Sequence, residues 1–188
     1  MIGTRDIVKI ALNLVVVYVI GGALLATAYV YTSPIIYRNV IKEKKAALEK
    51  IMPEANRIEK LGDWTIHEKH AEYFVAKKDS LVCGYLIESF GKGYSGLIHV
   101  LLAADTAGKI SKISILSHTE TPGLGDEIDA GWFKNQFAGK TSAQMKVLKS
   151  ATQENIQAIS GATISSRAVT EDAVKSALEQ LARAEKGN

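Results

Sequence analysis

The chain has 188 residues, a formal net charge of +3 and one cysteine. This length accommodates one ordinary domain plus a modest extra segment. The small net charge, without a dense basic block, gives no indication of nucleic-acid binding. A single thiol, Cys83, cannot form an intrachain disulfide, a Cys-rich zinc site or a cysteine-ligated iron–sulfur cluster. Any redox centre would therefore be organic or held by other ligands.

The first third of the chain contains a long uncharged stretch. No charged residue occurs between Lys9 and Arg38. A membrane-spanning helix needs roughly 20 mostly apolar residues, and this run exceeds that length. Tyrosines lie toward its end, where aromatic side chains are expected at a membrane interface. The pattern predicts a transmembrane helix near residues 10–31, within an N-terminal anchor that covers 1–33.

Two features bear on whether this anchor is retained and how it is oriented. The segment Ala26-Thr27-Ala28 has the small-x-small form of a signal-peptidase site, but the apolar run continues beyond it, which favours retention. More basic residues follow the span than precede it, so a positive-inside count favours a cytoplasmic C-terminal part. The basic residues are Arg5 and Lys9 before the span, and Arg38, Lys42, Lys44, Lys45 and Lys50 after it.

The segment after the span predicts a juxtamembrane amphipathic helix over residues 34–55. Its apolar residues recur at helical spacing with charged residues between them, and Pro53 marks its end. These apolar residues are Ile36, Val40, Ala47 and Ile51.

Residues 56–188 predict a single α+β domain with an antiparallel sheet packed by helices. Alternating apolar residues and turn signals predict strands over 72–77, 82–89, 96–104 and 110–117. The nearly continuous apolar run Leu97–Leu102 predicts that its strand is central, with His99 as a core or sheet-face histidine. A short helix is expected around 127–137 and a short strand near 156–159. An apolar stripe at helical spacing predicts a final helix over about 169–182.

A first chemistry-bearing segment, Ser160–Ser166, lies between that short strand and the final helix. Gly161 permits backbone conformations that are forbidden to larger residues. Four hydroxyl groups cluster beside backbone N–H groups that a helix start leaves unpaired, and the helix dipole favours an anion there, most naturally a phosphate. The alternative is plain N-capping by Ser165 or Ser166, which requires no ligand.

Two further segments are weaker when each is taken alone. His118–Asp126 contains two glycines and a proline, which indicates a structured loop after a strand. His118 and Glu120 would share one face of an extended chain, but two potential ligands are weak evidence for a metal or for acid–base chemistry. Gly91–Leu97 has three glycines around a tyrosine and is typical of a hairpin turn. It has neither the setting of a Rossmann loop nor the pattern of a P-loop.

Together, the three segments resemble the FMN-binding domain shared by the G subunit of Rnf electron-transport complexes and the C subunit of the sodium-pumping NADH:quinone reductase. The matching residues are Gly93–Gly96, His118–Gly125 and the Ser-Gly-Ala-Thr motif that ends at Thr163. The resemblance extends from the membrane helix to the last helix, and the compact length is more similar to the Rnf protein. One departure is Gln157, which stands where the family usually has an acidic residue.

The resemblance implies that FMN is attached through its phosphate to Thr163 as a phosphoester, by a flavin transferase. It places four residues at the phosphate end of FMN: Ser160, Gly161, Ala162 and Ser165. It places other residues along the flavin or near it: Glu120, Thr121, Leu124, Gly125, Gly93, Tyr94 and Gly96. No metal site and no catalytic residue for a free substrate are implied.

The function that the resemblance implies is an electron-relay subunit of a membrane-bound complex that couples electron transfer between ferredoxin and NAD to ion translocation. Its partners would be the other membrane and redox subunits. The expected location is the cytoplasmic membrane of a bacterium or archaeon, crossed once. The FMN domain would lie on the extracytoplasmic side, despite the lysine count, because large domains translocate with little regard to flanking charge. Alternatives are an anchored module that binds FMN or another phosphate ligand reversibly, as sensor or carrier, and a structural assembly subunit.

Overall fold

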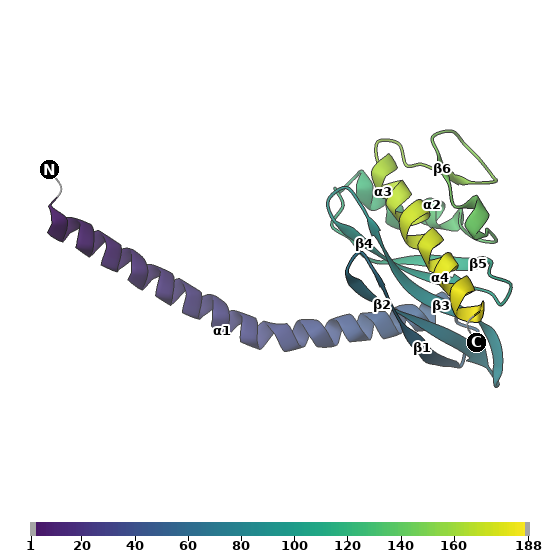
Figure 1. Cartoon of the computed structure of the whole chain (residues 1–188), viewed down its shortest axis with the longest axis horizontal. Coiled ribbons are helices and arrows are strands. Elements are labelled where there is room, and N and C mark those ends of the chain that lie inside the picture. The colour runs from purple at the N-terminus through teal and green to yellow at the C-terminus, as the bar shows by residue number, and fades with distance from the viewer. Residues whose placement is uncertain (1–2, 187–188) are drawn as a thin grey trace. The chain divides into compact units, whose positions relative to one another are not determined.

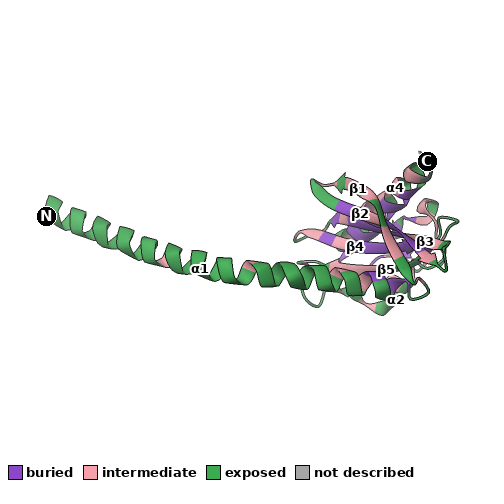
Figure 2. Cartoon of the chain, turned by 90° about the horizontal axis from the view of Figure 1, so that it is seen from below, coloured by how far each residue is buried: buried purple, intermediate pink, exposed green. Residues whose placement is uncertain are grey.

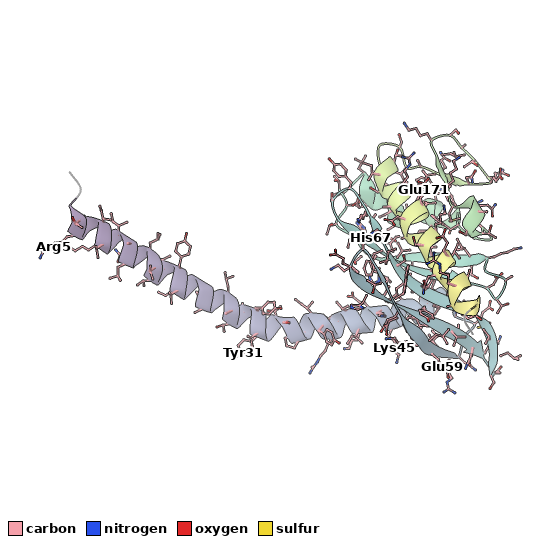
Figure 3. The ribbon with its side chains drawn as sticks, viewed as in Figure 1. Arg5, Tyr31, Lys45, Glu59, His67 and Glu171 are labelled. Atoms are coloured by element: carbon pink, nitrogen blue, oxygen red, sulfur yellow. The ribbon has the colours of Figure 1, made fainter. Side chains whose placement is uncertain are left out.

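The computed structural model describes residues 3–186 and divides into two compact units, one ending at Lys44 and the other beginning at Lys45. Helix α1 (Thr4–Ile51) is one continuous helix that includes the predicted span and most of the predicted juxtamembrane helix. It is long and apolar enough to cross a membrane, and its most apolar window is not buried by other parts of the structure. Figure 2 shows its exposed surface, and Figure 3 marks Arg5 near its start and Tyr31 farther along.

Two threonine hydroxyls in the apolar stretch of α1 form hydrogen bonds within the helix itself. The Thr27 hydroxyl donates to the Ala23 carbonyl at 2.7 Å, and the Thr32 hydroxyl donates to the Ala28 carbonyl at 2.6 Å. Such back-bonding hides hydroxyl groups that would otherwise be costly in hydrocarbon. The many exposed apolar side chains of this helix are characteristic of a surface that lipid or another protein covers.

The second unit is built on a five-stranded antiparallel sheet with the simple order β1-β2-β3-β4-β5. The strands are β1 (Arg57–Ile66), β2 (Lys69–Lys78), β3 (Leu81–Lys92), β4 (Leu97–Ala104) and β5 (Ile110–Ser117). A two-stranded parallel sheet follows, formed by β6 (Val147–Leu148) and β7 (Ile156–Gln157). The predicted α+β fold with an antiparallel sheet and helices is confirmed.

The helices of this unit follow the sheet in sequence. Short turns lie at Gly125–Asp129 and Ser142–Gln144, and helix α2 (Gly131–Asn135) is a single short piece. The chain ends in a continuous helical run made of α3 (Thr163–Arg167), a π-helical segment (Ala168–Val174) and α4 (Lys175–Lys186). This run lies across one face of the sheet (Figure 1).

Each face of the sheet has its own apolar core. On the helix side, Ile98, Val100 and Leu102 of β4 pack in one buried cluster with Val169 and Val174 of the π-helical segment. The other face is covered by the last residues of α1, where Leu48, Ile51 and Met52 pack with Phe74, Leu86 and Leu101. Figure 2 shows this burial concentrated in the middle strands. The two-sided burial explains why β4 is apolar along nearly all of its length.

Three details bear on the sequence-based expectations. Strand β1 was not predicted, and the middle strand is β3, with β4 between β3 and β5. The helix expected around 127–137 is instead a 3₁₀ turn followed by α2. The expectation for His99 is confirmed, since its ring stacks on Phe90 at 4.2 Å between centroids.

Candidate functional site

A cavity of about 1040 Å³ opens where three loops meet. The loops are the β3–β4 turn, the segment after β5, and the junction between β7 and α3. These are the three segments that the sequence singled out. Its lining residues are Tyr94, Glu120, Thr121, Leu124, Gly125, Trp132, Lys149, Gln157, Ala158, Ile159, Ser160, Gly161, Ala162, Thr163, Ile164 and Ser165. The volume is of the size that holds a cofactor-sized ligand.

Most of the predicted site residues lie in this lining, and two do not. Gly93 and Gly96 are outside it and instead close the β3–β4 turn, where the Gly93 N–H donates to the Gly96 carbonyl at 2.8 Å. Gly93 also leaves room for the Glu120 carboxylate, because a Cβ at this position would collide with the carboxylate oxygen Oε1. These two glycines therefore shape the turn that presents Tyr94.

Glu120 holds the three loops together. Its buried carboxylate accepts hydrogen bonds from the backbone N–H groups of Tyr94 at 3.2 Å and Ser95 at 2.9 Å, and from the Ser165 hydroxyl. Burial alone would raise the pKa of Glu120. The hydrogen bonds from Ser165, Ser95 and Tyr94 outweigh burial and lower this pKa below its usual value. The ionised Glu120 side chain thus links the β3–β4 turn to the start of α3 through hydrogen bonds.

The junction that precedes α3 has the backbone geometry expected of a ligand-binding turn. Gly161 has a φ of +80°, and a Cβ there would come within 2.9 Å of the Leu124 side chain. The residue before the helix is Ala162, which offers no side-chain hydrogen bond to the first helical N–H groups. Thr163 is the first residue of the helix, half-buried in the wall of the cavity.

N-capping by Ser165 or Ser166 is not observed. The Ser165 hydroxyl donates to Glu120, while the Ser166 hydroxyl donates to the Ala162 carbonyl at 2.9 Å and accepts the Ile159 N–H at 3.0 Å. Both hydroxyls therefore tie the junction to its surroundings. Neither occupies the N–H groups at the start of α3, so these groups are placed to meet an anion.

Large apolar side chains are exposed around the cavity. Tyr94 is 73% exposed, Ile164 54%, Trp132 47% and Leu124 43%. Exposure of this extent at four neighbouring aromatic and aliphatic groups favours a flat, largely apolar ligand. FMN fits the residues present, because its ring matches this apolar rim and its phosphate matches the helix start beside Ser160 and Thr163.

Several lining residues were not predicted from the sequence. Trp132 comes from α2, Lys149 from the chain just after β6, and Ile164 from the first turn of α3. Gln157, noted as a departure from the family pattern, also lines the cavity, and its backbone N–H donates to the Gln136 side chain at 2.7 Å. Only the fold brings these separated segments together.

The His118 side chain is used locally. Its Nδ1 atom accepts the Glu120 backbone N–H at 3.2 Å. Within residues 3–186, no cluster of three or more histidine, cysteine, aspartate or glutamate side chains is placed to hold a metal ion. The geometry therefore gives His118 a part in shaping the loop after β5.

Comparison with known proteins agrees with this geometry. Residues 93–179 match the family model of the FMN-binding domain. The C subunit of the Na(+)-translocating NADH-quinone reductase from Parabacteroides distasonis shares the fold with a TM-score of 0.51 and 28% identity, over 61% of this chain and 62% of that chain. The NqrC structure from Shewanella oneidensis has a TM-score of 0.50 at 24% identity, over 58% and 54%. Fold and cavity together define an FMN-binding domain.

Relatives that match nearly the whole chain identify the family. The G subunit of the proton-translocating ferredoxin:NAD(+) oxidoreductase complex of Clostridium ljungdahlii is 33% identical over 178 residues, covering 94% of this chain and 92% of that protein. The G subunit of the Na(+)-translocating ferredoxin:NAD(+) oxidoreductase complex of Acetobacterium woodii is 31% identical over 182 residues, covering 88% and 87%. This chain belongs to the family of G subunits of ion-translocating oxidoreductase complexes, the Rnf family. One apolar N-terminal helix in such a family indicates a single-pass membrane protein.

Proposed function

We propose that this chain is the electron-relay subunit of an Rnf-type complex and carries FMN linked through its phosphate to the Thr163 hydroxyl. The complex would couple electron transfer between ferredoxin and NAD to ion translocation, as the names of its relatives state for their own complexes. Bound FMN would supply a group that accepts and releases electrons singly or in pairs. The chain itself would hold and shield that group, without a free substrate of its own.

The observation that carries the proposal is the position of Thr163. This residue is in the cavity wall, at the first position of α3, directly after Gly161 and Ala162. The helix start supplies N–H groups and a favourable dipole for a phosphate at this point. A phosphate held there would be within reach of the threonine hydroxyl. A flavin transferase would transfer the FMN phosphoryl group to this hydroxyl from a flavin dinucleotide: the Thr163 oxygen would lose its proton and bond to phosphorus as the pyrophosphate bond breaks, and a nucleoside monophosphate would leave.

The remaining lining residues divide between the two ends of the ligand. Ser160, Gly161 and Ala162 would form the phosphate end together with Thr163. Thr121, Leu124 and Gly125 would lie along the ring, whose faces would meet the apolar groups around the cavity. Ser165 and Glu120 act indirectly, because their hydrogen bond fixes the helix start against the β3–β4 turn. Tyr94 would then stand beside the ring.

The chain would have three parts in the membrane-bound complex. Residues 1–33 would be the anchor, residues 34–55 a juxtamembrane helix and residues 56–188 the FMN-binding domain. The domain would lie on the extracytoplasmic side. The part of the chain after the span is longer than the roughly 60 residues up to which flanking charge controls orientation. Other membrane and redox subunits of the complex would be its partners.

Flavin fluorescence in a denaturing gel tests the proposal. The full chain is produced together with a flavin transferase, in parallel with the Thr163→Ala variant. We expect a fluorescent band for the wild-type chain and none for the variant, since denaturation releases every ligand that is not covalently bound. Fluorescence that is lost from the wild-type chain on denaturation would contradict the covalent link and favour reversible FMN binding.

A further inference from the structure

The cavity wall contains a lysine that none of the three sequence segments includes. Lys149 directly follows β6, and β6 pairs in parallel with β7, with Leu148 opposite Gln157. The Ala158 N–H donates to the Leu148 carbonyl at 2.8 Å, so the pairing continues to the ends of both strands. Lys149 therefore leaves the small sheet beside the chain that runs from Ala158 into the Ser160–Thr163 turn.

The charges of the cavity favour an anionic ligand close to this lysine. Among the residues that line the cavity in the described chain, Glu120 and Lys149 are the charged ones. The Glu120 carboxylate already accepts hydrogen bonds from two backbone N–H groups and the Ser165 hydroxyl. Lys149 is exposed, so its ammonium group is accessible to a ligand that enters the cavity. An ammonium group is a strong point-charge partner for phosphate.

We infer that Lys149 recognises the phosphate of FMN and makes the cavity prefer FMN over flavins that lack a phosphate. This inference rests on the proposed function, because it takes FMN as the ligand and the Ser160–Thr163 turn as its phosphate end. Lys149 adds a full positive charge to the partial charges that the N–H groups of α3 provide. This charge strengthens the binding of a phosphorylated flavin but not of a neutral flavin with the same ring.

A binding comparison with two flavins tests this role. The full chain is produced in cells without a flavin transferase and purified in detergent. FMN or riboflavin is then titrated with the protein, and binding is measured by the quenching of flavin fluorescence. For the wild-type chain we expect tighter binding of FMN than of riboflavin. In Lys149→Gln, FMN binding should weaken about tenfold while riboflavin binding stays the same, and Lys149→Arg should restore most of the preference. Added salt should reduce the wild-type preference.

The matched control is Lys146→Gln. Lys146 is also exposed and lies three positions earlier in the chain, but it does not line the cavity. Both variants remove the same charge, so an effect of net charge would appear in both. Equal weakening by the two variants, or equal loss of FMN and riboflavin binding in Lys149→Gln, would overturn the role of Lys149.

The outcomes also separate this inference from the proposed function. Binding of neither flavin to the wild-type chain would overturn the role of Lys149, whereas the covalent link would be overturned only by the absence of esterification at Thr163 in cells with a transferase. A wild-type chain that prefers FMN reversibly, loses that preference in Lys149→Gln and is never esterified at Thr163 would support Lys149 recognition while overturning the covalent link. Esterification at Thr163 together with an unchanged FMN preference in Lys149→Gln would support the covalent link and overturn the role of Lys149.

Discussion

At the scale of single residues, Glu120 shows how one buried carboxylate can join three loops of a candidate site through hydrogen bonds. The sequence placed Glu120 beside the flavin because it lies in the loop that resembles the family pattern. In the structure its carboxylate is turned toward the backbone of Tyr94 and Ser95 and toward Ser165. The acidic residue could be predicted from the sequence, but its partners could not, because they come from segments 25 and 45 positions away.

The lowered pKa of Glu120 makes the stability of the domain depend on pH. A carboxyl group with a lower pKa in the folded state stabilises that state above its unfolded pKa, and this contribution is lost as the pH falls through the folded pKa. The ordinary value is 4.5, so stabilisation should be complete above it and decline at lower pH. Glu120→Gln should lower the free energy of unfolding at pH 7 by about 1–3 kcal/mol and weaken the decline in acid.

Denaturant unfolding of the full chain in detergent, followed by tryptophan fluorescence from pH 7 to pH 3, measures this effect. Glu179→Gln is the control, since Glu179 is an exposed acid on α4. If Glu120→Gln and Glu179→Gln change the free energy of unfolding equally at every pH in this range, the stabilising role assigned to Glu120 is wrong.

At the scale of elements, strand β1 of the β1–β2 hairpin is the part that sequence patterns missed, whereas the predicted strand over 72–77 lies within β2. A register shift between Lys60 and Gly62 breaks the two-residue alternation within β1. In the sequence, the apolar residues Ile58, Leu61 and Trp64 recur every three positions, which is not a strand pattern. Strands with unbroken apolar runs, such as β4, were predictable because burial on both faces left a continuous signal.

The tip of the β1–β2 hairpin is joined to the final helical run by a hydrogen-bonding contact that only the fold creates. His67 Nε2 lies 2.8 Å from the Asp172 carboxylate, which also accepts the Lys92 backbone N–H at 2.8 Å. Asp172 belongs to the π-helical segment, and Lys92 ends the strand that leads to the Gly93–Gly96 turn. Figure 3 marks His67 at the end of the hairpin and Glu171 next to Asp172 in sequence. The contact therefore joins the end of β3 and the tip of the hairpin to the final helical run.

Removing this contact should loosen the domain without altering the cavity wall. Asp172→Ala leaves the Lys92 N–H without its acceptor and breaks the pair with His67, so we expect a loss of about 1–2 kcal/mol in the free energy of unfolding. Urea denaturation provides the measurement, with Glu179→Ala as the matched loss of an acid from the same helical run. A loss no larger than that of Glu179→Ala would show that the contact contributes nothing to stability.

At the scale of the whole molecule, the sequence predicted the anchor and the α+β domain because each depends on a long-range average of apolar residues. It also identified the β7–α3 junction through its motif. Trp132 and Lys149 were not predicted, since nothing in their local sequence indicates that tertiary packing brings them to one cavity. Composition thus reveals which part of the chain faces lipid, whereas the site emerges only when distant loops are assembled.

The proposed orientation in the membrane can be measured directly. We expect proteinase K to digest the domain after Lys45 in right-side-out vesicles and to leave it intact in inverted vesicles. A cytoplasmic protein of the same cells, sealed inside right-side-out vesicles, serves as the control for leakage. The opposite pattern would place the domain in the cytoplasm, as the basic residues after the span suggest.

The most direct test of the central claim is tandem mass spectrometry of the peptide that contains Thr163, taken from the native complex purified from cells with an active flavin transferase. The expected result is a peptide heavier by one esterified FMN, with the added mass assigned to Thr163 and absent from the Thr163→Ala variant. An unmodified Thr163 peptide from such cells, or FMN attached to another residue, would contradict the proposed covalent site.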